Sequence, residues 1–338
     1  KLLRTLASTN FGDQPHPEDN YICHRHRKEL EQLGIRYAPT ELANKFAIEA
    51  RQYDQRGWRG DDRYWNDHFG FHSYLTPLPD DMDRPWVFHH GGDYGDVIYA
   101  LPTIKALGGG ILFLSPTNRH PYPNKPHGAI DSAWVENLAP LLYCQDYIWH
   151  ALHTSTLPPS TDFDLNAFRD FYKNANPDNW RSLFSLHLRK FGVSYDESKP
   201  WLKVDYAVTV KDRPIVVNRT QRYQNDFFPW GDLVQLYGDQ MVFVGSDPEW
   251  ELFKGFSPSR PVPRVPTPTL LDVGRVCAGA KVVIGNQSST MAIALGLGKN
   301  VIQEVWPQNA NCMLNRPNAI YWKTPGQGSI TIPTDWLK

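Results

Sequence analysis

The sequence contains few cysteines and almost no net charge. Its four cysteines, among 338 residues, form no Cys-X-X-Cys pair, and their spacing predicts neither a zinc site nor a disulfide framework. We therefore expect a reducing compartment and predict a cytoplasmic protein. Lysine and arginine number 35 against 36 acidic residues, so no overall field attracts nucleic acid or an anionic membrane, and neither is expected as a partner.

Long apolar runs, internal repeats and targeting segments are also missing from the sequence. No apolar stretch reaches the roughly 20 residues needed to span a bilayer, so no membrane span is predicted. The sequence has no pattern of a secretory signal, and it begins at Lys1 rather than at methionine, as a piece of a longer protein would. Hydrophobic residues make up 41% of the chain, which predicts two or three domains with sizeable cores.

Residues 1–84 differ in composition from the rest, and we predict that they form a mainly helical N-terminal extension. They are charged, with helical patterns over 19–33 and 40–53. Residues 76–85 hold three prolines and four charged residues without periodicity, which indicates a linker to the rest of the chain.

From Trp86 onward, strand patterns alternate with helical patterns. The predicted strands are 86–90, 111–114, 147–149, 214–218, 241–245, 282–284 and 301–304. The predicted helices are 96–107, 132–142, most of 162–191, 230–237, 269–278 and 289–297. This alternation predicts parallel sheets with right-handed crossovers, which bind ligands beyond the carboxyl ends of their strands. We predict an α/β fold with two Rossmann-like domains, 85–200 and 201–338, that face a shared cleft.

The segment Val282–Gly298 carries the strongest signal of ligand binding. Three β-branched residues lead into a small polar turn, and the turn opens an apolar, alanine-rich helix. Free backbone N–H groups and the positive end of the helix dipole would face the same point, which favours an anion. The hydroxyls of Ser288, Ser289 and Thr290 add hydrogen-bond donors, so this turn is predicted to bind an anionic ligand.

A second strand, loop and helix begins at Trp86 and places Asp96 in the first turn of its helix. A carboxylate there can face a ligand and take a proton from a substrate hydroxyl. It can equally do no more than complement the helix dipole. Gly92 and Gly95 let a ligand approach the backbone of the loop, although the spacing of its glycines is not a dinucleotide fingerprint.

Three further positions follow strand ends in the second half of the chain. Arg219 and Arg222 come after the strand 214–217 and suit a diphosphate, because guanidinium groups bind phosphate oxygens in pairs; a solvated loop is the alternative. Gly245 opens a segment that could reach a base or ribose, or that is only a turn. Glu304 ends a strand and could accept hydrogen bonds from ribose hydroxyls, or be a surface carboxylate.

Two of these segments resemble one known family. The run Gly92–Leu107, with Gly-Asp-Val followed by an apolar helix carrying Leu-Pro, resembles the N-terminal signature of the heptosyltransferase-like glycosyltransferases, family 9. The run Ile284–Ala294 resembles the family's nucleotide-sugar turn and helix. The resemblance covers about residues 86 to 325. At the donor turn the sequence departs from the family pattern. Family members usually have an Asp-Thr/Ser-Gly-type turn and a histidine at the donor site, whereas this sequence has Asn-Gln-Ser-Ser over 286–289.

The resemblance implies a GT-B fold and an inverting, metal-independent transfer from a nucleotide-diphospho-sugar. Asp96 would be the general base that deprotonates the acceptor hydroxyl, and Arg219 or Arg222 would neutralise the leaving group. The acceptor would approach a loop of four residues, Gly92, Asp93, Tyr94 and Gly95. The donor would contact residues from several strand ends, namely Gly245, Asn286, Gln287, Ser288, Ser289, Thr290 and Glu304. No cofactor is expected beyond the donor itself.

Residues 1–75 resemble, more weakly, the closing part of a GT-A-type glycosyltransferase domain. Glu18 and Asp19 would match an acidic pair that acts on the acceptor, and His72 would match a late metal ligand. No Rossmann-like half with a DxD motif precedes them in this sequence, so a helical appendage remains the alternative.

The sequence therefore predicts a glycosyltransferase that moves a sugar onto a hydroxyl of a glycan or another acceptor. Two alternatives remain open: a nucleotide-sugar epimerase on the same fold, which would turn over its substrate without an acceptor, and a non-catalytic module that binds a nucleotide or a glycan. The sequence names neither the sugar, the base, the acceptor nor the oligomeric state.

Overall fold

The computed structural model describes residues 86–115, 130–153, 161–174, 182–256 and 261–338. These residues divide into two compact units, each with its own parallel sheet. One unit contains residues 86–93 and 104–169, and the other contains residues 94–103 and 170–338. The predicted extension 1–84, with Glu18, Asp19 and His72, lies outside the described residues.

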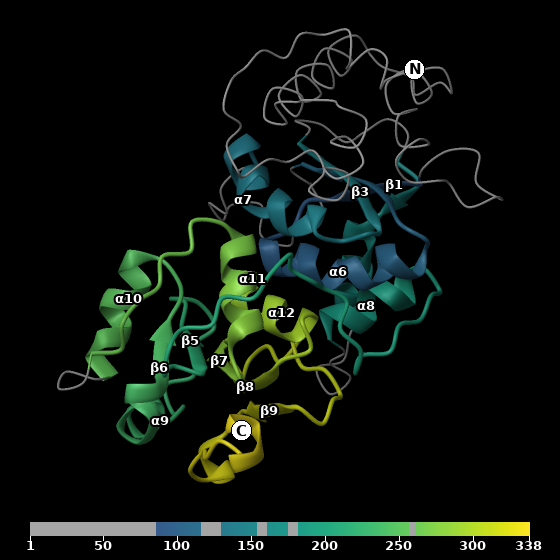
Figure 1. Cartoon of the computed structure of the whole chain (residues 1–338). Coiled ribbons are helices and arrows are strands. Elements are labelled where there is room, and N and C mark those ends of the chain that lie inside the picture. Colours follow the sequence, from purple (N-terminus) through teal and green to yellow (C-terminus); the bar gives the residue numbers. More distant parts are fainter. Residues whose placement is uncertain (1–85, 116–129, 154–160, 175–181, 257–260) are drawn as a thin grey trace, which may run out of the picture. The chain divides into compact units, whose positions relative to one another are not determined.

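The first sheet has the strand order β3-β2-β1-β4, and all of its neighbouring strands are parallel. Its strands are β1 (Trp86–His90), β2 (Gly110–Leu114), β3 (Ile148–His153) and β4 (Phe163–Asp164). Helices α6 (Tyr94–Ala106) and α7 (Ser132–Tyr143) connect the first three strands (Figure 1). The buried strands carry apolar side chains on both faces, as strands between two layers of helices do.

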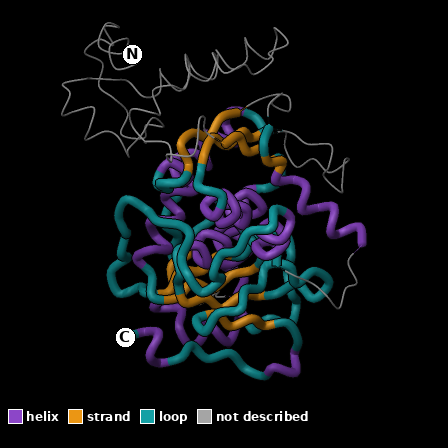
Figure 2. Tube along the Cα trace, turned by 90° about the vertical axis from the view of Figure 1, so that its right-hand side faces the viewer, coloured by secondary structure: helices purple, strands orange, loops and turns teal. Residues whose placement is uncertain are grey.

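The second sheet has the order β6-β5-β7-β8-β9, again with parallel neighbours throughout. Its strands are β5 (Ile215–Asn218), β6 (Met241–Phe243), β7 (Val282–Asn286), β8 (Asn300–Glu304) and β9 (Ala319–Trp322). Its helices are α8 (Leu183–Lys190), α9 (Trp230–Tyr237), α10 (Asp247–Phe253), α11 (Leu270–Gly279) and α12 (Ser289–Gly296). Figure 2 shows strands of this sheet side by side in a second view. The prediction of an α/β protein with parallel sheets is confirmed.

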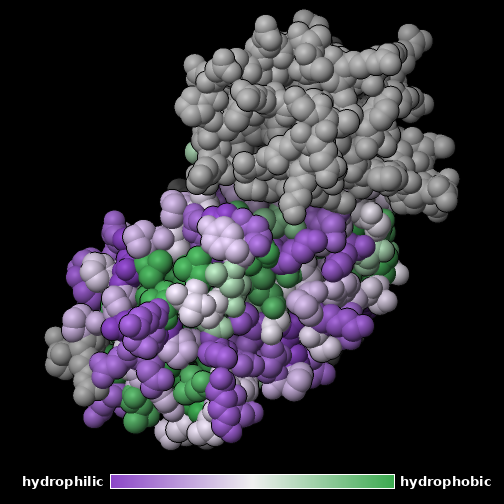
Figure 3. All heavy atoms as spheres, in the orientation of Figure 1, coloured by the Kyte–Doolittle hydropathy of each residue, from purple (hydrophilic) through white to green (hydrophobic). Residues whose placement is uncertain are grey.

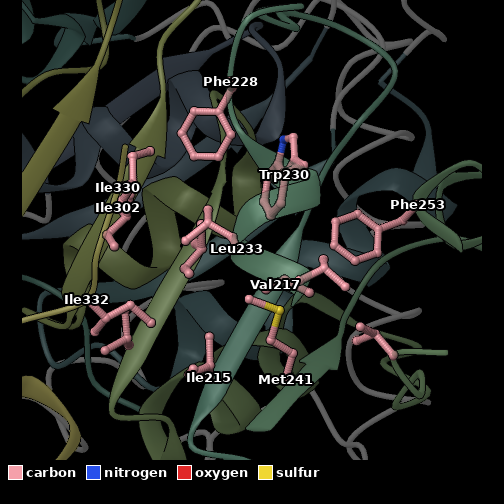
Figure 4. Packing of buried hydrophobic residues seen from close by; sticks show 14 of the residues in the cluster. Ile215, Val217, Phe228, Trp230, Leu233, Met241, Phe253, Ile302, Ile330 and Ile332 are labelled. Carbon is pink, nitrogen blue, oxygen red and sulfur yellow. The ribbon is translucent and has the colours of Figure 1, made fainter. Parts of the chain in front are cut away.

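The main core of the second unit lies between one face of this sheet and α9. Ile215 and Val217 point to the same face because alternate side chains of a strand share a side, and they pack with Trp230 and Leu233 of α9 (Figure 4). The opposite face carries Val283, which is fully buried, and α12 packs against β7 and β8. Burial of apolar surface stabilises a fold by about 25 cal/mol for each Å² removed from water. Because both faces of this sheet are buried, the strand ends are held in place.

Three predictions about elements need correction. The strand 301–304 is not the last, because β9 pairs with β8 at the sheet edge. The segment 162–191 holds the predicted helices, as the 3-10 helix η2 (Leu165–Asn174) and the short helix α8, but it also holds the short strand β4, which was not predicted. The predicted turn after Gly245 continues into α10, because Ser246 and Glu249 form a capping box that starts a helix.

The face drawn in Figure 3 is mixed in polarity, with hydrophilic residues around the apolar side chains that reach the surface. Within the described ranges, none of the helices is both long and apolar enough to cross a bilayer.

Candidate functional site

The predicted donor residues meet at the topological switch point of the second sheet. From β5 the chain passes outward to β6 on one side, and it later returns to place β7 on the other side of β5. Parallel sheets bind ligands beyond the carboxyl ends of the two strands that flank such a point. Asn218 ends β5 and Asn286 ends β7, so Arg219 and Gln287, the next residues, lie at this edge.

Asn286 holds the basic loop that follows β5. Its side-chain Oδ1 accepts a hydrogen bond from the Thr220 backbone N–H at 2.9 Å, and its Nδ2 donates to the carbonyl oxygens of Thr220 and Arg222. The side chain is fully buried. Asn286 therefore fixes the path of the loop that carries both arginines.

Ser288 is the N-cap of α12 and also ties this helix to β5. Its hydroxyl oxygen accepts a hydrogen bond from the Met291 backbone N–H, and its proton is donated to Asn218 Oδ1 at 2.8 Å. Ser289 is half-buried and Thr290 is buried in the first turn of the helix. A helix leaves the backbone N–H groups of its first turn without partners inside the helix. The cap satisfies the N–H of Met291, so the N–H groups of Ser289 and Thr290 are the ones that can receive an anion.

Close approach of β5 and β7 requires the glycine at the end of β7. A Cβ added to Gly285 would lie 2.6 Å from the Asn218 carbonyl oxygen, nearer than non-bonded atoms approach. Gly245 is constrained in the same way: its φ of +145° favours glycine, and a Cβ there would lie 3.0 Å from Asn218 Nδ2. Both glycines thus let the backbone crowd around Asn218.

Gln287 fixes the segment that follows β8. Its Nε2 donates to the Asn309 carbonyl oxygen at 2.7 Å, and its Oε1 accepts from the Trp306 backbone N–H at 2.8 Å. The same segment carries Cys312. Burial raises the pKa of the Cys312 thiol to about 12, a hydrogen bond with Gln287 opposes this rise, and the negative charge of Asp96 adds to it.

The start of α6 belongs to this same unit, and it places Asp96 near the segment that Gln287 holds. Asp96 lies near enough to Cys312 for its charge to act on the thiol, and Cys312 contacts Gln287. Two residues further along α6, the Ile98 carbonyl accepts a hydrogen bond from the indole N–H of Trp201 at 3.1 Å. The structure therefore places the predicted base and the predicted anion-binding turn within a single compact unit.

Arg219 and Glu304 bind one another at the end of β5 and β8. The guanidinium Nε and Nη2 donate to the two carboxylate oxygens at 3.0 Å each. The same oxygens also accept from the Asn225 backbone N–H at 2.5 Å and from Trp230 Nε1 at 2.7 Å. Glu304 is fully buried and all four of its acceptor positions are filled. No acceptor position of Glu304 is left for a ribose hydroxyl.

The two arginines of the loop differ sharply in their surroundings. Arg219 has a side chain that is 13% exposed, and its guanidinium lies over the ring of Phe256, 5.1 Å from the centroid. Arg222 is exposed, with its guanidinium 5.3 Å from the ring centroid of the adjacent Tyr223. Arg219 is held in one orientation by its ion pair with the buried Glu304.

The predicted acceptor-side loop begins in the first unit, where side chains hold its backbone. The Gly91 N–H donates to Asn166 Oδ1 and the Gly92 N–H donates to His90 Nδ1, both at 2.9 Å. Arg169 Nη1 donates to the same Asn166 oxygen. These contacts fix the backbone of Gly91 and Gly92, where the loop begins.

A buried polar network below this loop was missed by the sequence analysis. His89 Nε2 lies 2.7 Å from Ser115 Oγ, and His89 Nδ1 lies 3.3 Å from Asp164 Oδ1, across the switch point between β1 and β4. Burial acts to raise the pKa of Asp164, but hydrogen bonds from His89 and Asn166 outweigh it and lower that pKa. The available signal was the Asp-Leu-Asn run of 164–166, whose strand has only two residues and is hard to recognise.

Residues that could hold a metal do not gather in the described part of the chain. No group of three histidine, cysteine or acidic side chains lies close enough together there. His72, the predicted metal candidate, lies outside the described residues.

Comparison with known proteins found likeness only among solved structures. The chain matches no protein-family model and no curated protein. It is similar to a family 9 glycosyl transferase from Veillonella parvula, with 14% identity, a TM-score of 0.48, and coverage of 70% of this chain and 85% of that one. It is also similar to the E. coli heptosyltransferase WaaC with ADP, with 12% identity, a TM-score of 0.47, and coverage of 71% and 93%.

A third similar structure is the E. coli ADP-heptose lps heptosyltransferase II. The identity is 12%, the TM-score is 0.46, and the alignment covers 70% of this chain and 90% of that one. Likeness at these levels leaves the function to be inferred from the site.

Proposed function

We propose that this protein is a glycosyltransferase that moves a sugar from a nucleotide-diphospho-sugar to an acceptor hydroxyl. The observation that carries the proposal is that a clamped arginine, a helix N-terminus and a carboxylate belong to one compact unit. Arg219, the first turn of α12 and Asp96 supply the three functions that such a transfer needs. The sequence resemblance to family 9 glycosyltransferases points to the same reaction.

The donor's diphosphate occupies the switch point between β5 and β7 in this proposal. The N–H groups at the start of α12 and the hydroxyls of Ser289 and Thr290 donate to its oxygens, and Arg219 donates from the β5 side. Negative charge grows on the diphosphate as the bond to the sugar breaks, and fixed donors stabilise charge most where it develops. Asn286, Gln287 and Ser288 hold the two loops and the helix that carry these donors.

Asp96 acts as the general base in this proposal. The acceptor hydroxyl gives its proton to the carboxylate while its oxygen attacks the anomeric carbon from the face opposite the diphosphate. The bond between the anomeric carbon and the phosphate oxygen breaks, and because attack comes from the opposite face the configuration inverts. Arg219 and the start of α12 stabilise the departing diphosphate, so the proposed mechanism requires no metal. Gly92, Asp93, Tyr94 and Gly95 form the acceptor-side loop, and Gly245 lies beside Asn218 at the nucleotide end.

The wider architecture is part of the same proposal. Residues 85–200 form the acceptor domain and residues 201–338 form the nucleotide-sugar domain of a GT-B enzyme, with a cytoplasmic location. The piece 170–338 keeps the compact unit of the structure apart from residues 94–103. It is expected to bind nucleotide when a peptide of residues 94–106 is added, and the piece 85–169 is not.

Calorimetry with ADP, UDP, GDP and dTDP tests the donor site directly. We expect micromolar binding of one diphosphate by the wild-type chain and at least tenfold weaker binding by Arg219→Ala. Arg222→Ala is the matched control, because it removes the same charge from the same loop at an exposed position, and it is expected to change binding by less than threefold. Absence of binding for all four diphosphates would contradict the proposal and favour a module that binds a glycan without nucleotide.

A further inference from the structure

Glu304 occupies only one of the two edges of the Arg219 guanidinium. The carboxylate accepts from Nε and Nη2, which form the side edge of the group. The other edge, formed by Nη1 and the second N–H of Nη2, points away from Glu304 because the guanidinium is planar and its donors are fixed. In the part of the chain that the structure describes, the guanidinium contacts only Glu304 and the ring of Phe256.

The position of Glu304 is itself fixed by donors from two other segments. Trp230, at the start of α9, donates its indole N–H, and Asn225 donates its backbone N–H. The Asn225 side chain is anchored in turn by the carbonyl oxygens of Val305 and Lys323 at 2.9 and 3.0 Å. The hydrogen bonds from Asn225 and Trp230 hold the carboxylate independently of Arg219. The carboxylate cannot rotate without losing them, so it transmits a defined orientation to Arg219.

We propose that Glu304 is a positioning residue, which with Trp230 and Asn225 aims the Nη1–Nη2 edge of Arg219 at a terminal phosphoryl group of the ligand. This inference rests on the proposed function and deepens it by naming the part of the donor that Arg219 recognises. The parallel N–H groups of the edge match two oxygens on one phosphorus, in the paired geometry that arginine forms with phosphate.

The ion pair also decides what kind of recognition Arg219 can supply. Glu304 already balances the charge of the guanidinium, so the pair as a whole is neutral. Arg219 then contributes directed hydrogen bonds rather than net attraction for any anion. The outcome is selectivity for the number and position of phosphoryl groups: a nucleoside diphosphate reaches the edge with its second phosphate, and a nucleoside monophosphate does not.

The test compares each nucleoside diphosphate with its own monophosphate by calorimetry, using ADP with AMP, UDP with UMP, GDP with GMP and dTDP with dTMP. We expect the wild-type chain to bind one diphosphate at least tenfold more tightly than the matching monophosphate. Glu304→Gln replaces one acceptor by a donor that faces the guanidinium, and it is expected to reduce this preference to threefold or less while monophosphate affinity changes by less than twofold. Arg219→Lys keeps the charge without the paired edge and is expected to do the same.

Trp230→Phe provides a second variant in case Glu304→Gln does not fold. It keeps a large ring in the core but removes one donor to Glu304, and it is expected to lower the preference by about threefold to fivefold. A purely structural role would lower the melting temperature of these variants but leave the ratio of the two affinities unchanged. The double variant Arg219→Ala/Glu304→Gln is expected to match Arg219→Ala alone, because Glu304 acts only through Arg219.

The two levels of the proposal fail in different ways. If wild type binds a diphosphate, Arg219→Ala weakens it, and Glu304→Gln and Trp230→Phe keep the full preference, then the positioning inference is overturned and the donor site stands. If wild type binds none of the eight nucleotides, both the donor site and the inference built on it are overturned.

Discussion

The Ser288 hydroxyl donates a hydrogen bond to Asn218 Oδ1 at 2.8 Å, and this contact joins the N-cap of α12 to the end of β5. Asn218 in turn donates from Nδ2 to the Val244 carbonyl oxygen at 2.8 Å. Three segments from different parts of the chain are thereby held at one edge of the second sheet. Ser288 thus has a structural part in the turn that the sequence predicted as an anion site.

Ser288→Ala and Ser289→Ala are expected to affect different properties: stability in the first variant and diphosphate binding in the second. Loss of the Ser288 cap should lower the free energy of unfolding by about 1 kcal/mol, the usual cost of removing an N-cap side chain. Ser289 makes no such contact, so its alanine variant should keep wild-type stability and weaken diphosphate binding severalfold. Urea denaturation and calorimetry on both variants check this. Equal stability of the two would show that the cap contributes little.

Asp96→Asn is expected to keep the affinity for the donor and to lower turnover by roughly 10²- to 10⁴-fold, the range found for loss of a general base. The amide has the size of the carboxylate but cannot take the proton. Glu136, an acidic residue of α7 in the other unit, offers a control as Glu136→Gln, which should leave turnover unchanged. Wild-type turnover of Asp96→Asn would remove this residue from the mechanism.

Asp164→Asn is expected to destabilise the protein at neutral pH and to have little effect in acid. The pKa of Asp164 is lowered on folding from its ordinary value of 3.8. Its ionised form therefore stabilises the fold above that value, and the stabilisation is lost as the pH falls below 3.8 through the lowered pKa. Thermal unfolding of wild type and variant from about pH 7 down to about pH 2 measures the difference. A gap in melting temperature that stays constant over this range would contradict the prediction.

Removal of divalent metal is expected to leave the transfer reaction unchanged. Arg219 and the start of α12 stabilise the departing diphosphate in the proposed mechanism, so no metal takes part in any step. Turnover measured after treatment with EDTA, with and without added Mg²⁺, tests this. Loss of activity on chelation, with recovery on adding Mg²⁺, would instead direct attention to His72 and the N-terminal segment.

Local sequence patterns predicted much of the two sheets because each strand–turn–helix unit contains its own signals. The apolar run ending at His90 and the turn at Gly91–Gly92 predicted β1 and α6, and the run ending at Ile284 predicted β7 and α12. Strand β9 was missed although Ile320, Tyr321 and Trp322 are residues that favour strands. In the structure no helix lies between β8 and β9, so the strand–helix alternation that marked the other strands is absent at this point.

The sequence by itself determined which short segments could bind an anion or hold a base, because glycines, helix starts and strand ends are local features. Only the tertiary structure decided what the polar side chains do there. Glu304 lies 85 positions from Arg219 and His89 lies 75 from Asp164, and no local pattern pairs residues so far apart. Glu304 was expected to contact a ribose, but it is buried as the partner of Arg219. Glutamate is seldom buried, so this position could be known only from the packing of β5, β8 and α9 around it.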